Sequence, residues 1–199
     1  MAKNLMIKRI TVFCGSSLGT DDQFRSQATL LGNTLAKQNI EMVYGGAKIG
    51  LMGAVADGAL DEGGKVIGVL PKFLRSKEIA HEGLTQLILV DSMHERKTRM
   101  NELSDGVIAL PGGFGTLDEL FEMLTWGQLG LHQKPIAILN INGFYDPLIA
   151  LVRAMVDGGL LKEVNQKMLL ISDNIDDLLN RMRNYVAPTV GKWIDEGTV

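Results

Sequence analysis

The residues best suited to chemistry lie in the stretch "PGGFGTLDE" at 111–119. Its glycines let backbone N–H groups approach a ligand without a Cβ in the way. The helix that follows begins with unpaired N–H donors and a partial positive charge, which together suit a phosphate. Glu119 stands close to that helix start. The stretch therefore predicts a bound phosphate and, beside it, a carboxylate that does chemistry.

The same spacing also has a purely structural interpretation. Thr116 followed by Glu119 matches a capping box, in which the Glu119 carboxylate accepts the backbone N–H of Thr116. Asp118 lies nearer the polar side with Glu122 and is expected to be a solvated charge that favours the helix start. A Glu119 held in a capping box is less available as a catalyst. The sequence leaves both interpretations open.

Two adjacent cations, Arg96 and Lys97, fall in unexpected places on the helix predicted at 93–104. They flank the centreline of its apolar stripe, which should face the sheet. The stripe consists of Met93, Met100 and Leu103. Buried cations are costly unless an anion meets them, although their stems can pack while the charged heads reach water. For an adjacent pair we favour an anion site.

Two further glycine-rich segments, "CGSSLG" at 14–19 and "GGAKIGLMG" at 45–53, follow predicted strands. They could bind a nucleotide or simply make tight turns. Neither glycine loop continues into Lys-Ser or Lys-Thr, which excludes a P-loop. The first strand is not followed by G-x-G-x-x-G and the second does not end in an acidic residue, which argues against a nicotinamide dehydrogenase. The residues predicted to form possible phosphate or nucleotide loops are Gly15, Ser16, Gly45, Gly46 and Gly112.

These segments need elements that bring them together. Continuously apolar strands are predicted at 10–14, 41–44, 66–70, 87–90, 106–110, 136–140 and 168–171. Helical periods are predicted at 22–38, 50–62, 93–104, 116–129, 146–158 and 175–186. Such alternation predicts one α/β domain over 1–199, a doubly wound Rossmann-like parallel sheet with helices on both faces and loose termini at 1–7 and 189–199. Ligands bind such sheets beyond the carboxyl ends of the strands, where the strand order reverses.

Composition narrows the classes of partner. The net charge of −3 argues against nucleic acid, and Cys14 as the only cysteine allows no internal disulfide. The three histidines have no metal-ligand spacing. No apolar run is long enough for a membrane span. We therefore expect a cytoplasmic protein with no metal, no cofactor and no membrane partner.

The helix predicted at 116–129 is apolar on two sides, which favours a homodimer that covers the outer one. The main stripe is predicted to be Leu117, Leu120, Phe121 and Leu124. Met123 and Trp126 form the second patch, with Glu119 beside them. Glu119 is then expected to border a covered region.

The motifs "MHERKTRM" (93–100) and "PGGFGTLDE" (111–119), separated by one short strand, resemble those of the LONELY GUY (LOG) family. The segment "YGGAKIGLMG" (44–53) is similar to the family's early glycine loop, with Ala47 where glycine is common. The likeness extends from "FCGSS" (13–17) to "KPIAILNINGFYDPL" (134–148). It therefore covers nearly the whole chain.

The resemblance implies hydrolysis of the N-glycosidic bond of N6-substituted AMP, a cytokinin riboside 5′-monophosphate, to free base and ribose 5-phosphate. Arg96 and Glu119 match the family's catalytic pair. The positions that match its nucleotide site are Glu78, Arg96, Lys97, Gly113, Phe114, Gly115, Thr116, Leu117, Asp118, Glu119 and Thr125. Bond breaking builds positive charge on the ribose, which Glu119 could stabilise directly or by activating water. Arg96 would add to the phosphate clamp or orient the reacting groups, and this scheme requires no divalent metal.

Two alternatives stay open on sequence. One is a general purine 5′-nucleotide nucleosidase that acts on plain AMP. The other is a non-catalytic nucleotide-binding carrier or sensor, against which the carboxylate at 119 weighs. Members of the family have also been labelled lysine decarboxylases, but the sequence has no evident site for pyridoxal phosphate.

Overall fold

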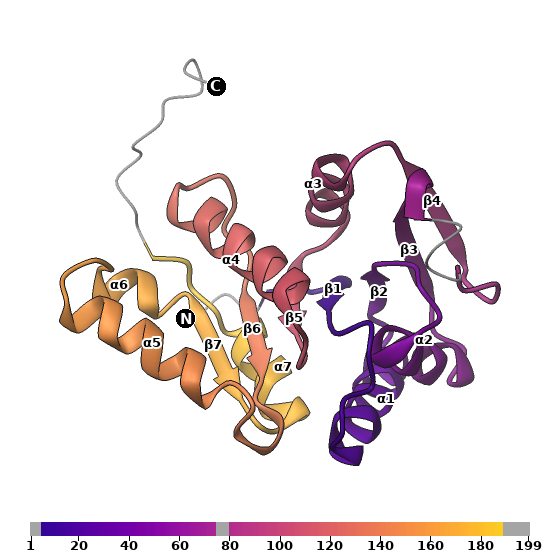
Figure 1. The fold of residues 1–199 in the computed structure, drawn as a ribbon, viewed down its shortest axis with the longest axis horizontal. Coiled ribbons are helices and arrows are strands. Elements are labelled where there is room, and N and C mark those ends of the chain that lie inside the picture. The colour runs from indigo at the N-terminus through magenta and orange to yellow at the C-terminus, as the bar shows by residue number, and fades with distance from the viewer. Residues whose placement is uncertain (1–4, 75–79, 189–199) are drawn as a thin grey trace.

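The computed structural model describes residues 5–74 and 80–188 and contains one seven-stranded sheet (Figure 1). The strands are β1 (Arg9–Phe13), β2 (Glu41–Tyr44), β3 (Val66–Pro71), β4 (Gln86–Val90), β5 (Gly106–Ala109), β6 (Ile136–Leu139) and β7 (Leu169–Ser172). Every pairing is parallel, in the order β4-β3-β2-β1-β5-β6-β7. All seven predicted strands are confirmed. Their continuously apolar runs are typical of strands that are covered on both faces of a sheet.

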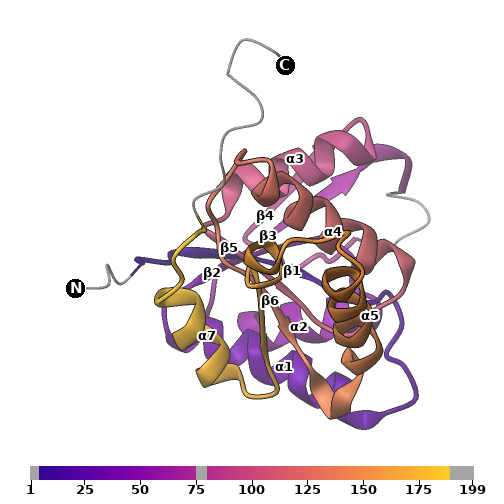
Figure 2. The same ribbon diagram turned by 90° about the vertical axis from the view of Figure 1, so that its left-hand side faces the viewer.

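Helices cover both faces of the sheet, so the predicted doubly wound class is confirmed. One face packs against α1 (Asp22–Lys37), α2 (Gly50–Asp61) and α7 (Ile175–Arg183). The other packs against α3 (Met93–Leu103), α4 (Phe114–Gln128) and α5 (Asp146–Asp157). Figure 2 shows the two layers with the sheet between them. Short turns of helix at η1 (Lys72–Leu74), η2 (Ile141–Gly143) and α6 (Glu163–Gln166) complete the elements.

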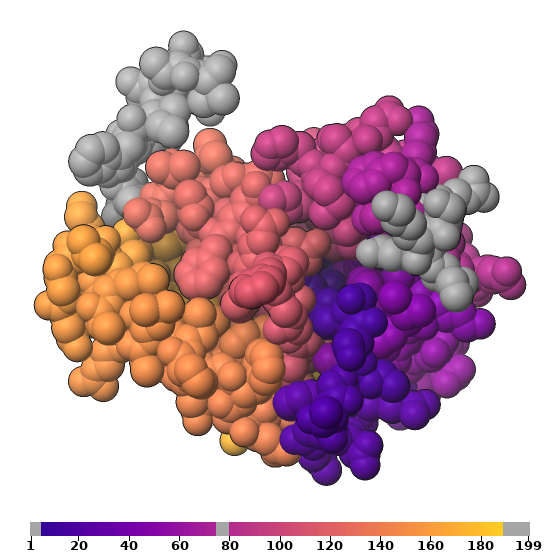
Figure 3. Space-filling view, viewed as in Figure 1, coloured from indigo at the N-terminus to yellow at the C-terminus, as the bar shows by residue number. Residues whose placement is uncertain are grey.

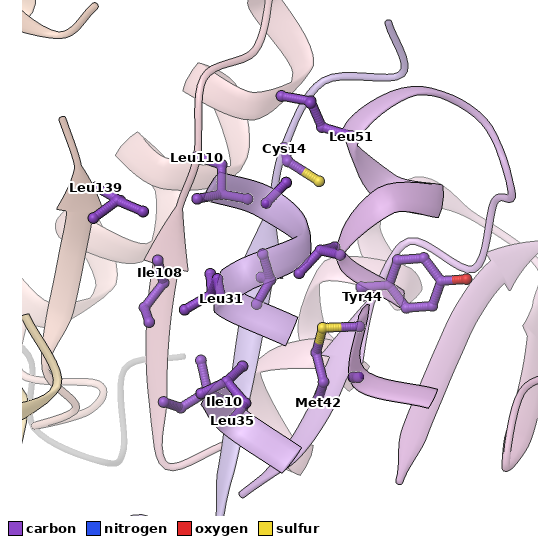
Figure 4. Close-up of a cluster of buried hydrophobic side chains, with 14 of the residues drawn as sticks. Ile10, Cys14, Leu31, Leu35, Met42, Tyr44, Leu51, Ile108, Leu110 and Leu139 are labelled. Carbon is purple, nitrogen blue, oxygen red and sulfur yellow. The ribbon is translucent and has the colours of Figure 1, made fainter. Parts of the chain in front are cut away.

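The core on the first face joins strands from both halves of the sheet. Ile10 of β1, Ile108 of β5 and Leu139 of β6 lie in one cluster with Leu31 and Leu35 of α1 (Figure 4), and all five are fully buried. Burying side chains of this size contributes roughly 1.5–3 kcal/mol each. This cluster therefore fixes β1 and β5 side by side, which matters for the site.

The α1–α2 layer packs closely because two glycines lie at the helix contact. A Cβ on Gly32 would lie 2.2 Å from the Val55 carbonyl oxygen, and one on Gly58 would lie 2.3 Å from the Thr29 carbonyl oxygen. Either methyl group would force the two helices apart. The close contact in turn sets where α2 begins, beside the loop that follows β1.

The strand order reverses between β1 and β5, and the loops after these two strands are tied together. Phe13 pairs with Ala109 in the sheet. Beyond it, Leu110 N–H donates to the Phe13 carbonyl oxygen at 2.9 Å, and Gly15 N–H donates to the Pro111 carbonyl oxygen at 3.0 Å. The glycine stretches after β1 and β5 therefore meet at the topological switch point, where open α/β sheets bind ligands.

Residues 5–7 belong to the N-terminal segment that was predicted to be loose, but two of them contact the rest of the domain. Leu5 N–H donates to the Arg183 carbonyl oxygen at 2.7 Å, and Ile7 packs against the core. Residues 1–4 and 189–199 lie outside the described part of the chain. Within residues 5–74 and 80–188, no helix has the length and hydropathy needed to cross a bilayer.

Candidate active site

A cavity of about 330 Å³ opens at the carboxyl ends of β1, β2 and β5. In Figure 3 the start of α4 borders the indigo segments that follow β1. The cavity is lined by Val12, Phe13, Cys14, Gly15, Ser16, Gly45, Met52, Leu74, Met93, Arg96, Gly113, Phe114, Gly115, Thr116, Asp118 and Glu119. Segments far apart in the sequence thus converge where the switch point predicted a ligand.

Arg96 and Glu119 are the two buried charges of this cavity. Arg96 is 7% exposed and Glu119 is 9% exposed. The Arg96 Nη2 atom lies 4.0 Å from the Glu119 Oε1 atom. Arg96 Nη1 contacts Met93 Sδ at 3.8 Å, and Arg96 Nε has no hydrogen-bond partner among the described residues. A buried guanidinium with an unpaired donor at a cavity wall suits an anionic ligand.

The start of α4 differs from its prediction. The helix begins at Phe114 with Gly113 as its N-cap, so Thr116 is its third residue and the capping-box interpretation that the sequence left open is wrong. Gly113 has no side chain to cap the helix, and the first turn carries no acidic residue. The first intrahelical bond runs from Leu117 N–H to the Gly113 carbonyl oxygen at 3.1 Å. The N–H groups of residues 114–116 therefore precede the helical ladder, at the cavity wall, where an anion can accept them.

Gly112 has a steric role beside this turn. A Cβ on Gly112 would lie 2.1 Å from Thr116 Oγ1. Thr116 is only 4% exposed, so its side chain has little freedom to move away. The glycine thus lets the buried threonine pack directly against the turn that enters α4.

A side-chain cap is present instead at the start of α3. Ser92 is the N-cap and accepts the Glu95 N–H at 3.1 Å, while the Glu95 carboxylate accepts the Asp91 N–H at 2.7 Å. The sequence "SMHE" at 92–95 carries the signal for this cap. The cap fixes the first turn of the helix that carries Arg96.

Lys97 lies outside the cavity and binds carboxylates of the protein itself. Its Nζ atom lies 3.1 Å from Asp118 Oδ2 and 3.0 Å from Glu122 Oε2. Burial would lower the pKa of Lys97, but hydrogen bonds to Glu122 and Asp118 outweigh it and raise that pKa. These three residues, which we call the Lys97 clamp, join α3 to α4. The predicted anion for this cation is therefore a pair of carboxylates on either side of Glu119.

Asp118 and Glu122 were both predicted on the polar side of the helix, and the structure confirms this for Asp118 alone. The Asp118 side chain is 62% exposed and also lines the cavity, whereas the Glu122 side chain is 18% exposed. Glu122 is covered because it packs against Lys97 across the α3–α4 contact. Helical periodicity alone cannot anticipate that contact.

The buried face of α4 is also rotated from the predicted one. Its buried residues are Thr116, Glu119, Leu120, Met123 and Gly127. Of the predicted main stripe, Leu120 is fully buried and Leu117 and Leu124 are half-buried against the core, whereas Phe121 is half-buried outside it. Thr116, Glu119 and Met123 lie on the same buried face of α4. Thr116 and Glu119 line the cavity, and Met123, further along the helix, packs into the core. The prediction failed because apolar residues occur on both sides of this helix.

Several of the predicted site residues do not line the cavity. Leu117 and Thr125 do not line it, and Thr125 Oγ1 donates to the Phe121 carbonyl oxygen at 2.8 Å. Gly46 is buried behind the cavity wall in the left-handed region, with φ of 82°. Gly112 lines a second, apolar cavity of about 290 Å³ that also contains Leu18, Phe24 and Phe144. Glu78 falls outside the described residues.

Sequence reasoning missed several residues that line the cavity. Met52 and Leu74 line it as apolar wall, with no motif to mark them. Cys14, directly after β1, is buried and also lines the cavity. Burial, reinforced by the nearby Glu119 charge, raises the pKa of the Cys14 thiol and keeps it neutral.

Comparisons with known proteins agree with these motifs. Residues 52–182 match a family model described as "Possible lysine decarboxylase". The chain is 41% identical to the cytokinin riboside 5′-monophosphate phosphoribohydrolase LOG2 of Arabidopsis thaliana, over 90% of this chain and 84% of that protein. It is 45% identical to the probable cytokinin riboside 5′-monophosphate phosphoribohydrolase LOGL1 of Oryza sativa subsp. japonica, over 89% of this chain and 79% of that protein.

The chain belongs to the LONELY GUY (LOG) family. Its fold also resembles that of a solved molybdenum cofactor binding protein from Rippkaea orientalis, with a TM-score of 0.65 and 22% identity over 88% of this chain and 94% of that one. At this identity the likeness concerns the fold alone.

The family model and the relatives carry different activity names. The family model is described as a possible lysine decarboxylase, whereas the relatives are named as hydrolases. Pyridoxal phosphate is held by a lysine Schiff base. Among the described residues, no lysine lines the cavity of this LOG-family chain. Its chemically useful side chains are instead an arginine and a glutamate, which match the hydrolase motifs.

Proposed function

We propose that the protein hydrolyses the N-glycosidic bond of N6-substituted AMP and releases the free base and ribose 5-phosphate. The observation that carries this proposal is the convergence of Arg96, Glu119 and the uncapped start of α4 in one cavity. The names of the relatives, phosphoribohydrolases of cytokinin riboside 5′-monophosphates, give the same activity.

The 5′-phosphate is proposed to bind at the α4 start. There it accepts the N–H groups of residues 114–116, and the positive end of the helix and the Arg96 guanidinium add charge. Gly113 and Gly115 leave the approach open, because a Cβ on either would meet no atom within 4 Å. This phosphate-binding end anchors the nucleotide away from the reacting bond. It holds the sugar in place and so lowers the barrier through positioning.

Glu119 is proposed to lie beside the anomeric carbon. As the bond to the base breaks, positive charge builds on the ribose, and the carboxylate stabilises it or takes a proton from the attacking water. Water adds its oxygen to the anomeric carbon, and the base leaves with the bonding electron pair and gains a proton. The 4.0 Å between Arg96 and Glu119 puts phosphate-binding and carboxylate groups in reach of one ribose 5-phosphate.

The role that we propose for Lys97 is to hold this geometry. Its ammonium group is already engaged by Asp118 and Glu122, which flank Glu119 in the sequence. The clamp fixes α4 relative to α3, and hence Glu119 relative to Arg96. A direct contact with substrate would require Lys97 to leave both carboxylates.

Apolar side chains at the cavity support an N6-substituted substrate over plain AMP. Phe114 is 94% exposed and Met93 is 37% exposed, and both line the cavity together with Leu74. Exposed aromatic and thioether groups gain by covering an apolar substituent. They offer no polar group that would select an unsubstituted amine.

A product assay tests this proposal. AMP, N6-isopentenyl-AMP and the two matching nucleosides are each incubated with the protein, and free base and ribose 5-phosphate are measured. We expect both products in equal amounts from the isopentenyl nucleotide, faster than from AMP, with little base from the nucleosides. Equal rates on AMP would favour the general purine nucleosidase. Tight AMP binding with no base released would favour a carrier or sensor and reject the hydrolase.

We also propose that the protein is a homodimer that covers the outer face of α4. Phe121 is half-buried on that helix and does not belong to the core cluster, and Leu151 of the neighbouring α5 is 51% exposed. A second copy would bury these apolar groups. Sedimentation at micromolar concentration should give twice the chain mass of 21.7 kDa, and Phe121→Glu should give monomers. A wild-type protein that sediments at the single-chain mass would contradict the dimer.

A further inference from the structure

Gly45, at the carboxyl end of β2, lies against the guanidinium of Arg96. A Cβ on Gly45 would lie 2.1 Å from Arg96 Nη2 and 3.3 Å from Arg96 Cζ. It would also lie 3.0 Å from Met52 Sδ. No backbone atom is among these nearest neighbours. The space that a side chain would take at this position is therefore occupied by the Arg96 head group.

Backbone conformation does not explain a glycine here. Gly46 and Gly50 have φ of 82° and 60°, in the left-handed region that favours glycine, whereas Gly45 is not among the glycines with positive φ. A left-handed backbone is therefore not the reason for a glycine at position 45. What distinguishes Gly45 is the room it leaves on the cavity wall.

The position of the Arg96 head group depends on that room. The guanidinium also lies 3.8 Å from Met93 Sδ, through Nη1, and 4.0 Å from Glu119 Oε1, through Nη2. Arg96 is 7% exposed, so it cannot simply swing into bulk water. The absent side chain at 45 leaves room for the Nη2 end of the guanidinium, whose Nη2 atom also lies 4.0 Å from Glu119 Oε1.

We propose that Gly45 is a positioning residue that sets the location of the Arg96 guanidinium in the active site. The sequence offered Gly45 as part of a possible phosphate loop, and the geometry gives it a steric role toward the arginine. This inference rests on the proposed function, because it assigns Arg96 to the bound nucleotide. It names a residue that touches no reacting atom and acts through another side chain.

The displacement caused by Gly45→Ala can be bounded. Non-bonded carbon and nitrogen atoms pack at about 3.5 Å, so an added methyl group would push Nη2 away by roughly 1 Å or more. A misplacement of about 1 Å of a positioning group can cost on the order of 10²-fold in rate. The atoms met are the ends of flexible side chains, which can move with little loss of folding stability.

A double-mutant cycle tests the inference. Gly45→Ala, Arg96→Ala and the double variant are compared with the wild type in kcat/KM for the nucleotide and in AMP affinity. Gly45→Ala should lower kcat/KM by about 10²-fold. In the Arg96→Ala background it should lower it by less than about threefold, because coupled residues are not additive. AMP affinity should show the same coupling.

A matched control is Gly106→Ala. Gly106 is a buried glycine of β5, and its added Cβ would lie 2.8 Å from the flexible end of Met182, 3.1 Å from Pro135 Cγ and 3.3 Å from the Pro135 carbonyl oxygen, and Gly106 does not line the cavity. Both single glycine variants should unfold within about 4 °C of the wild type, and the control should keep wild-type activity.

Three outcomes are decisive. Wild-type activity in Gly45→Ala, or losses that add fully in the double variant, would overturn the positioning role. Absence of turnover in the wild type itself would reject the proposed function instead. In that case the double-mutant cycle uses AMP affinity alone. Non-additive losses of affinity in Gly45→Ala and Arg96→Ala support the positioning role, and additive losses overturn it.

Discussion

Glu119→Gln should lower kcat by at least about 10²-fold, equivalent to roughly 2.7 kcal/mol of transition-state stabilisation. Glutamine keeps the size of the side chain and removes the charge that stabilises the developing cation and the basicity that activates water. AMP affinity should change by less than about fivefold, because the phosphate is gripped at the α4 start and not by this carboxylate. Hydrolysis rates under saturating nucleotide, together with calorimetric AMP titration, give both quantities.

Glu102→Gln is the matched control for this prediction. Glu102 lies on α3 with a 55% exposed side chain, paired only with its neighbour Arg99 among the described residues. Its loss should leave kcat unchanged. An unchanged rate in Glu119→Gln itself would remove Glu119 from the catalytic role and with it the proposed mechanism.

Arg96→Ala should weaken AMP binding by roughly 10- to 10²-fold, and adenosine binding by far less. Hydrogen bonds to charged groups are worth about 1.5–3 kcal/mol, and here the lost donors face the phosphate-bearing end of the ligand. Ligand titrations with AMP and adenosine measure the difference between the two affinities. That difference separates a role toward the phosphate from a general loss of structure.

Arg99→Ala serves as the control on the same helix. Arg99 is 46% exposed and pairs with Glu102 on the surface, so its removal should leave both affinities unchanged. If Arg96→Ala weakened adenosine as much as AMP, the arginine would not act through the phosphate. The anion site that we assign to the cavity would then lose its cation.

The fold was predictable because its signals are local and repeated. Seven apolar runs separated by helical periods specify a parallel sheet covered on both faces, and the glycine-rich ends of β1 and β5 meet because strand order places these strands together. Arg96 and Glu119 could be named as site residues for the same reason. Arg96 flanks the apolar stripe of α3, Glu119 lies beside apolar residues of α4, and each lies in the first two turns of a helix that follows a strand.

The errors arise where a short motif has two physical outcomes. Thr116 and Glu119 fit a capping box, but Gly113 is the N-cap, so the helix starts earlier and has no side-chain cap. Lys97 was rightly placed toward an anion, yet only the packing of α3 on α4 reveals that Asp118 and Glu122 supply it. The role of Gly45 was beyond sequence reasoning, because it depends on where a side chain 51 positions away comes to lie.

The proposed binding mode is best tested by a crystal structure of the Glu119→Gln variant with AMP bound. In that mode, phosphate oxygens lie within about 2.7–3.2 Å of the backbone nitrogens of residues 114–116. The same mode has the guanidinium of Arg96 on the phosphate-bearing side and the anomeric carbon next to the residue 119 side chain. A phosphate bound instead at Lys97, or in the second cavity beside Phe24 and Phe144, would contradict it.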